Sequence, residues 1–221
     1  MAHLEWVFLP LFRFTDRPPL TLHKALATSP KFFVDVLCTL YRPTEDSSVA
    51  EPPPDDPERA QAIASQAYDL LNSWHHLPGM ADNGVLDVAA LEAWVKEVRI
   101  LCAKVGRGEI GDHHIGQVLA TAPPAADGVW PAIPVRDVIE ITRSRGLERG
   151  IIIGVYNSRG ATSRGITDGG IQERELAQRY HAFARETALE WPRTSAVLER
   201  MAKDYEEEGR RHDDDAERNQ W

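Results

Sequence analysis

The sequence has few of the features that mark secreted or membrane proteins. It contains only two cysteines, Cys38 and Cys102, among 221 residues. Both fall at apolar positions of predicted helices, which indicates buried thiols in a reducing cytoplasm rather than a disulfide. No apolar run approaches the ~20 residues that a membrane-spanning helix needs. The first residues lack a basic region followed by an apolar core, so we expect no signal peptide and a cytoplasmic, non-membrane protein.

Catalytic, nucleotide-binding and metal-binding motifs are also missing. The sequence has no GxxxxGK[ST], GxGxxG, GxSxG, HExxH or CxxC pattern. The pairs His75-His76 and His113-His114 consist of adjacent residues, which point about 100° apart on a helix and do not easily share one ion. We therefore expect no catalytic residue, no metal site and no cofactor.

The charges are predominantly negative and unevenly placed. Thirty-four acidic residues against 25 basic ones give a formal net charge of −9, which argues against nucleic acid as a partner. The Pro-rich segment 44–57 carries acids and no base, which predicts a mobile surface loop. The acids at 206–208 and 213–215 look like a solvated run, and Glu173 suits the dipole at the start of a helix.

Apolar residues recur at intervals of three and four in several segments, as they do on the buried face of a helix. Caps mark helix starts at Ser29-Pro30, at Asp87 and at Asp112, and Pro192 is expected to break or kink a long final helix. We predict a mainly α fold, an irregular bundle of six to eight helices with at most one short β-hairpin near 151–166. The whole chain, 1–221, is read as a single helical domain with a frayed tail at 210–221, because no apolar period follows Gly209.

The segment 151–156 is rich in β-branched residues, which favours a short strand. The sequence NSRGATSRG that follows would then be the turn of a hairpin, or the whole segment would be an irregular buried loop. A helix is expected from Ile171 onward.

Glycines and arginines before this last helix form the candidate site. Glycine-rich loops at helix starts present backbone amides to anions. The alternative is that the glycines permit tight turns and that the arginines pair with nearby acids. The candidate ligand-binding or partner-binding residues are Asn157, Ser158, Arg159, Arg164, Gln172 and Arg174.

The opening of the chain, HLEWVFLPLFRF, is densely apolar. Three explanations remain open. The apolar side chains fill the core of this domain, they contact a preceding domain, or they form a homo-oligomer interface. The residues concerned are Trp6, Phe8, Leu9, Leu11, Phe12 and Phe14.

Several segments, among them LEWVFLPLF, SPKFFVDVLCTLYRP, GVYNSRGATSRG and WPRTSAVLERMAKDYE, resemble the helical C-terminal region of large multidomain bacterial proteins of unknown function. The resemblance implies a helical C-terminal module and assigns no role to any residue. We expect a non-catalytic recognition or scaffolding module whose partners are other protein domains. The alternative is a small-anion-binding, nucleotide-binding or enzymatic domain with its site at the loop 157–164.

Overall fold

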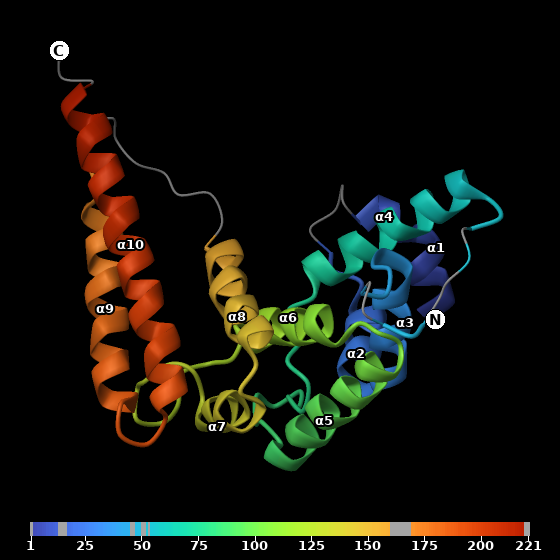
Figure 1. The fold of residues 1–221 in the computed structure, drawn as a ribbon, viewed down its shortest axis with the longest axis horizontal. Helices are drawn as coiled ribbons and strands as arrows, with labels where there is room; N and C mark the ends of the chain where they lie inside the picture. Colours follow the sequence, from blue (N-terminus) through green and yellow to red (C-terminus); the bar gives the residue numbers. More distant parts are fainter. Residues whose placement is uncertain are drawn as a thin grey trace.

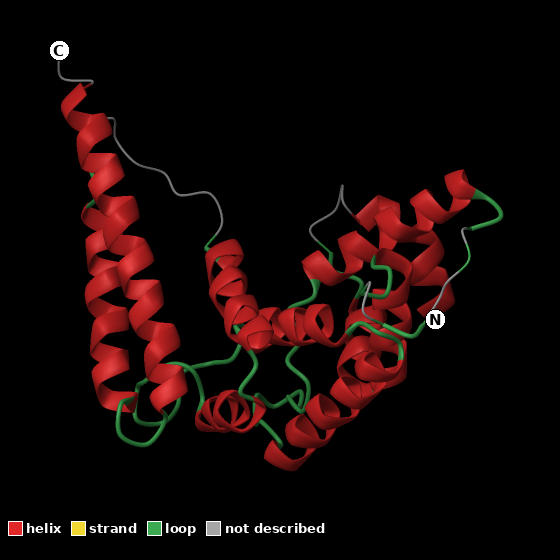
Figure 2. Ribbon diagram, viewed as in Figure 1, coloured by secondary structure: helices red, strands yellow, loops and turns green. Residues whose placement is uncertain are grey.

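The computed structural model describes residues 2–12, 17–44, 47–49, 52, 54–159 and 169–218. These residues form ten helices and no strand (Figures 1 and 2). The mainly α prediction is confirmed, whereas the expected six to eight helices are too few. The helices are α1 (Ala2–Phe12), α2 (Leu20–Thr28), α3 (Pro30–Leu40), α4 (Pro57–Ser73), α5 (Val88–Lys104), α6 (Gly108–Leu119), α7 (Ile133–Thr142), α8 (Arg145–Ser158), α9 (Ile171–Thr187) and α10 (Pro192–Arg218).

Three aromatic rings from separate segments organise the core of the N-terminal half. Phe33 of α3 lies 5.6 Å from the ring of Trp74 and 5.2 Å from the ring of Trp94, and the two tryptophan rings are 5.8 Å apart. The predicted caps hold two of the helices that surround this cluster. Ser29 accepts a hydrogen bond from the amide of Phe32, and Asp87 accepts one from the amide of Ala90.

The start of α6 differs from the expected position. The helix begins at Gly108, one turn before Asp112, so Asp112 is not its cap. The carboxylate of Asp112 instead accepts a hydrogen bond from Nε of Arg99 at 2.8 Å. From the sequence alone Asp112 looks like a cap. Its partner, Arg99, lies on α5 and cannot be recognised from the residues next to Asp112.

The predicted strand at 151–156 is wrong, because these residues belong to α8. Gly146, Gly150 and Gly154 recur every four residues and therefore share one face of the helix. This face lies against α6 so closely that a Cβ atom on Gly150 would stand 2.0 Å from the carbonyl oxygen of His113. Backbone-to-backbone packing of α8 on α6 thus overrides the strand preference of the isoleucines. The remainder of the expected hairpin, 160–166, lies outside the described residues.

Helices α9 and α10 lie side by side at one end of the molecule (Figure 1). Pro192 is the first residue of α10, so the predicted break is confirmed. The expected end at Gly209 is wrong, since α10 continues to Arg218 and the predicted frayed tail is helical as far as the structure describes it. Gly209 lies inside the helix, where the backbone of Gly170 packs closely against it: a Cβ on Gly170 would be 2.2 Å from the Gly209 carbonyl oxygen.

Polar contacts from α7 and α8 hold the base of this helix pair. Nε1 of Trp191 donates to Asp137 at 2.7 Å, and the amide of Thr194 donates to Glu140 at 2.9 Å. Arg193 pairs with Glu148 at 2.6 Å. These contacts therefore fix α9 and α10 to the rest of the molecule at the end where the turn joins the two helices.

Helix α1 buries only part of its apolar surface. Leu9 is buried, and Trp6 and Phe12 pack against the core. Four other side chains, at i, i+3, i+4 and i+7, are 50–59% exposed and form the α1 stripe: Leu4, Val7, Phe8 and Leu11. The expectation that the apolar opening is buried therefore fails within this chain for Phe8 and Leu11, while Phe14 lies outside the described residues. Among the helices that the structure describes, none is long and apolar enough to cross a membrane.

Candidate binding site between α8 and α10

A groove of about 450 Å³ lies between α8 and α10. Two residues one helical turn apart on α8 line one side, and residues at successive turns of α10 line the other. We call it the α8–α10 groove. Its lining consists of Ile152, Tyr156, Met201, Asp204, Tyr205, Glu207, Glu208, Arg211, His212 and Asp215.

The groove combines apolar and acidic surfaces. Met201 and Tyr205 are buried, whereas the ring of Tyr156 is 58% exposed. Asp204 and Glu207 are exposed and form no ion pair with another described residue. The groove therefore has an apolar floor beside carboxylates that are open to solvent.

Arg159 contacts two residues of the groove lining, Glu208 and Tyr205. It follows the last residue of α8, and its Nη2 donates a short hydrogen bond to Glu173, while Nη1 lies 3.4 Å from Glu208. Its guanidinium carbon is 5.4 Å from the centre of the Tyr205 ring. Burial acts to lower the pKa of Arg159, but the hydrogen bond and charge of Glu173, together with Glu208, raise this pKa overall. Arg159 thus joins the C-terminal end of α8 to both α9 and α10.

The carboxylate of Glu173 is the most buried acid of this region. Its side chain is 0% exposed, so its charge must be compensated inside the protein. Arg159 provides this compensation. The sequence alone explains Glu173 by the helix dipole. That explanation predicts a residue at the surface, whereas the side chain is buried.

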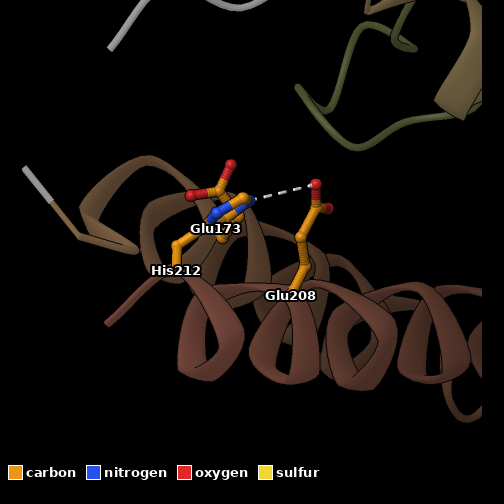
Figure 3. A group of neighbouring side chains, drawn as sticks. All are labelled: Glu173, Glu208 and His212. Carbon is orange, nitrogen blue, oxygen red and sulfur yellow. Dashed lines mark ion pairs between the residues drawn. The ribbon is translucent and has the colours of Figure 1, made fainter. Parts of the chain in front are cut away.

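Glu173, Glu208 and His212 bring three metal-ligand side chains together (Figure 3). One donor atom from each lies within 4.8 Å of the others. Nε2 of His212 is 3.6 Å from Glu208, one turn away on the same helix. A carboxylate pair with an imidazole is a donor set that zinc and similar cations use.

The structure separates the residues that the sequence groups as a site. Asn157 and Ser158 are exposed, and the Ser158 hydroxyl donates to the carbonyl of Val155 at 2.8 Å. Gln172 is exposed on α9. Arg174 pairs with Asp213 on α10 rather than facing Arg159. Arg164 lies outside the described residues.

Arg159 and Arg174 are each paired with a carboxylate of this chain, which counts against the predicted anion site. Asp213 accepts hydrogen bonds from Arg174 and from the backbone amide of Gly170, at 2.8 Å for the latter. The amide at the start of α9 is therefore already occupied by an acid of this chain. Carboxylates fill the positions that an anionic ligand would take at Arg159 and at Arg174.

Sequence reasoning misses Glu208, His212, Tyr156 and Tyr205. One signal is present: Glu208 and His212 are four residues apart, the helical spacing at which two side chains can share a ligand. The surrounding acids hide this signal because they look like a solvated run. No signal in the sequence places Glu173 or Arg159 beside them, because those contacts join three helices.

The other titratable groups that first suggest chemistry have structural roles. Nε2 of His114 is within 3.0 Å of the Tyr41 hydroxyl, and burial lowers the pKa of His114 to about 4. Burial raises the pKa of the Cys102 thiol to about 12, which leaves it protonated and unreactive. Neither Cys38 nor Cys102 forms a disulfide.

A scan against protein-family models, a search of curated proteins and a search of solved structures each found no match.

Proposed function

We propose that the protein is a recognition or scaffolding module whose α8–α10 groove binds a segment of a partner protein. The partner segment carries apolar side chains beside Lys or Arg. The observation that carries this proposal is the groove itself, with Tyr156 exposed over an apolar floor and with Asp204 and Glu207 open at its rim.

Interface chemistry supports this choice of partner. Tyrosine is enriched at protein interfaces because it offers a large apolar face with a polar end. Carboxylates that are open to solvent at a rim steer positively charged partners toward the groove. The overall charge of −9 acts in the same direction.

The rival function, binding of a small anion or nucleotide at the loop 157–164, has less support. An anion at Arg159 would have to displace Glu173, a buried carboxylate with no access to water. Arg174 is likewise engaged with Asp213.

The proposed setting is the cytoplasm, within the C-terminal part of a larger bacterial protein, so that other domains of that protein are natural partners. The two cysteines that form no disulfide and the resemblance of the helical segments support this setting.

Two labelled peptides with the same amphipathic pattern test the groove, one of Leu and Lys and one of Leu and Glu. We expect the Lys peptide to bind the wild-type protein and the Glu peptide not to bind. The double variant Asp204→Lys/Glu207→Lys should weaken binding by about tenfold or more, because it reverses the rim charge. The control Glu186→Lys/Glu190→Lys makes the same change in net charge at exposed sites on and after α9.

Fluorescence anisotropy at two salt concentrations gives the affinities. Equal losses of affinity in the groove variant and in the control would mean that general charge attraction accounts for the binding. That result would contradict the proposal. Absence of binding by the Lys peptide to the wild-type protein would contradict it as well.

A homo-oligomer through the N-terminal apolar stretch is a second candidate function, favoured by the α1 stripe. The exposed stripe carries no charge, and the one acid of α1, Glu5, is engaged in accepting hydrogen bonds from the amides of Thr21 and Leu22. An uncharged apolar stripe is complementary to a second copy of itself. Because one short helix buries less area than a standard interface, the dimer should be weak.

Sedimentation velocity over a range of concentrations tests this second function. Phe8→Glu places a charge in the centre of the stripe and should keep the protein monomeric. A wild-type protein that is monomeric at every concentration eliminates the α1 dimer without affecting the groove proposal.

A further inference from the structure

We propose that Glu173, Glu208 and His212 form a site for one divalent transition metal ion of the Zn²⁺ class, which binds in exchange for the guanidinium of Arg159. The ion is a second ligand, an inorganic cation held beside the α8–α10 groove, whatever partner segment that groove binds.

The placement of the three side chains carries the proposal. Glu208 and His212 are one turn apart on α10, and Glu173 faces them from α9 (Figure 3). Metal sites in helical bundles are built in this way, from carboxylate and imidazole side chains on facing helices. All three donor atoms lie within 4.8 Å of one another, so the helices need not move for the ligands to converge.

The remaining adjustment is within reach of side-chain rotation. Zinc bonds of about 2.1 Å in a tetrahedral arrangement separate neighbouring donors by about 3.4 Å. The side chains of His212 and Glu208 are 30% and 19% exposed, which leaves both room to turn. Glu173 is fixed by burial and serves as the stationary ligand. The groove beside Glu208 and His212 provides a path for the ion and room for water as a fourth ligand.

Charge explains why the ion competes with Arg159. The buried carboxylate of Glu173 requires a positive partner, and Arg159 supplies one from the end of α8. A divalent cation compensates the same carboxylate together with Glu208. Arg159 then separates from Glu173 and Glu208, while its guanidinium stays in contact with the face of the Tyr205 ring.

The exchange of Arg159 for the metal ion changes how the end of α8 is held. Arg159 is the residue through which the C-terminal end of α8 contacts Glu173 and Glu208. Metal binding replaces that contact with bonds confined to α9 and α10. The ion therefore strengthens the α9–α10 pair while it releases the end of α8.

Isothermal titration of the full, tag-free chain with ZnCl₂ tests the site, and Co²⁺ absorption reports the coordination geometry. We expect one ion per chain. His212→Gln and Glu208→Gln should each weaken binding by roughly tenfold or more, since each removes a ligand. Arg159→Met should tighten binding, because the ion pair between Arg159 and Glu173 no longer has to be broken.

Matched controls separate this site from adventitious binding. Glu217→Gln makes the same chemical change at an exposed position of α10 outside the groove. His181→Gln removes a different histidine that lies between two carboxylates, Glu199 at 2.9 Å and Glu206 at 3.0 Å. Both controls should bind Zn²⁺ like the wild type.

Three results would overturn the proposal: no binding by the wild-type protein, equal binding by wild type and His212→Gln, or loss of binding in His181→Gln alone. Weaker binding by Arg159→Met would refute the exchange. Circular dichroism and a thermal melt confirm that each variant is folded, and Glu208→Gln serves in place of His212→Gln if the latter is not.

Discussion

Substitution of Gly150 by alanine is the most direct test of how α8 is held. A Cβ atom added at Gly150 would lie 2.0 Å from the carbonyl oxygen of His113 and 3.0 Å from the Cα of Gly116. Carbon and oxygen atoms that are not bonded require more than ~3 Å, so the backbones of α6 and α8 must separate by about 1 Å. No side chain can rotate to relieve the clash, because the nearest atoms are backbone.

Two effects of opposite sign set the magnitude. Alanine is a better helix former than glycine by about 1 kcal/mol. Overpacking of a close contact costs about 1–3 kcal/mol, and backbone clashes fall at the upper end of that range or above it. We expect a net loss of about 2 kcal/mol in the free energy of unfolding. For a chain of this length, that loss lowers Tm by roughly 4–8 °C.

Urea unfolding followed by circular dichroism measures the effect. The matched control is Gly108→Ala in the first turn of α6, where an added Cβ meets no atom within 4 Å. This control should be as stable as the wild type or slightly more stable. If Gly150→Ala were as stable as Gly108→Ala, the contact between α6 and α8 would be looser than described and the reasoning would be refuted.

Two further predictions concern buried charges. Arg159→Met should destabilise the metal-free protein by about 3 kcal/mol in urea unfolding, because it removes the positive charge of Arg159 from the buried Glu173 carboxylate. An effect as small as that of Arg174→Met, which breaks an exposed pair, would contradict this. Burial, as the main cause, lowers the pKa of His23 and of His114 to about 4. These folded-state pKa values lie below the unfolded value of about 6.5. Each neutral histidine therefore contributes about 3 kcal/mol to the free energy of unfolding above pH ~6.5, and this contribution is lost as the pH falls toward 4. Unfolding measured between about pH 7 and pH 4 should show this loss, and His114→Gln should reduce the slope; an unchanged slope would contradict the assignment.

Much of the helical layout is visible in the sequence because its signals are local. Ser29 and Asp87 cap helices by accepting hydrogen bonds from amides three residues away. Gly106 follows the end of α5 in a left-handed conformation that glycine adopts without strain. Pro192 starts α10. Each of these residues acts on its own neighbours, so no knowledge of distant segments is needed.

The candidate site could be predicted only in part. Arg159 is a predicted site residue that contacts Glu208 and Tyr205 of the groove lining, but the sequence does not indicate its partners. Glu173 and Glu208 reach it from α9 and α10, 14 and 49 residues away along the chain. Proximity in sequence groups the exposed residues Asn157, Ser158 and Gln172 with Arg159, and the structure does not bring them into the groove.

The amino-acid sequence by itself determined that this is a helical protein and where several of its helices begin, because caps, prolines and apolar spacing act within a single turn. Tertiary structure alone decided that the segment 151–156 is helix, that α10 continues past Gly209, and that Arg159 pairs with acids. The physical reason is shared by all three. Glycine faces that let backbones touch, and buried charges that need a partner, gain their effect from segments that are distant along the chain.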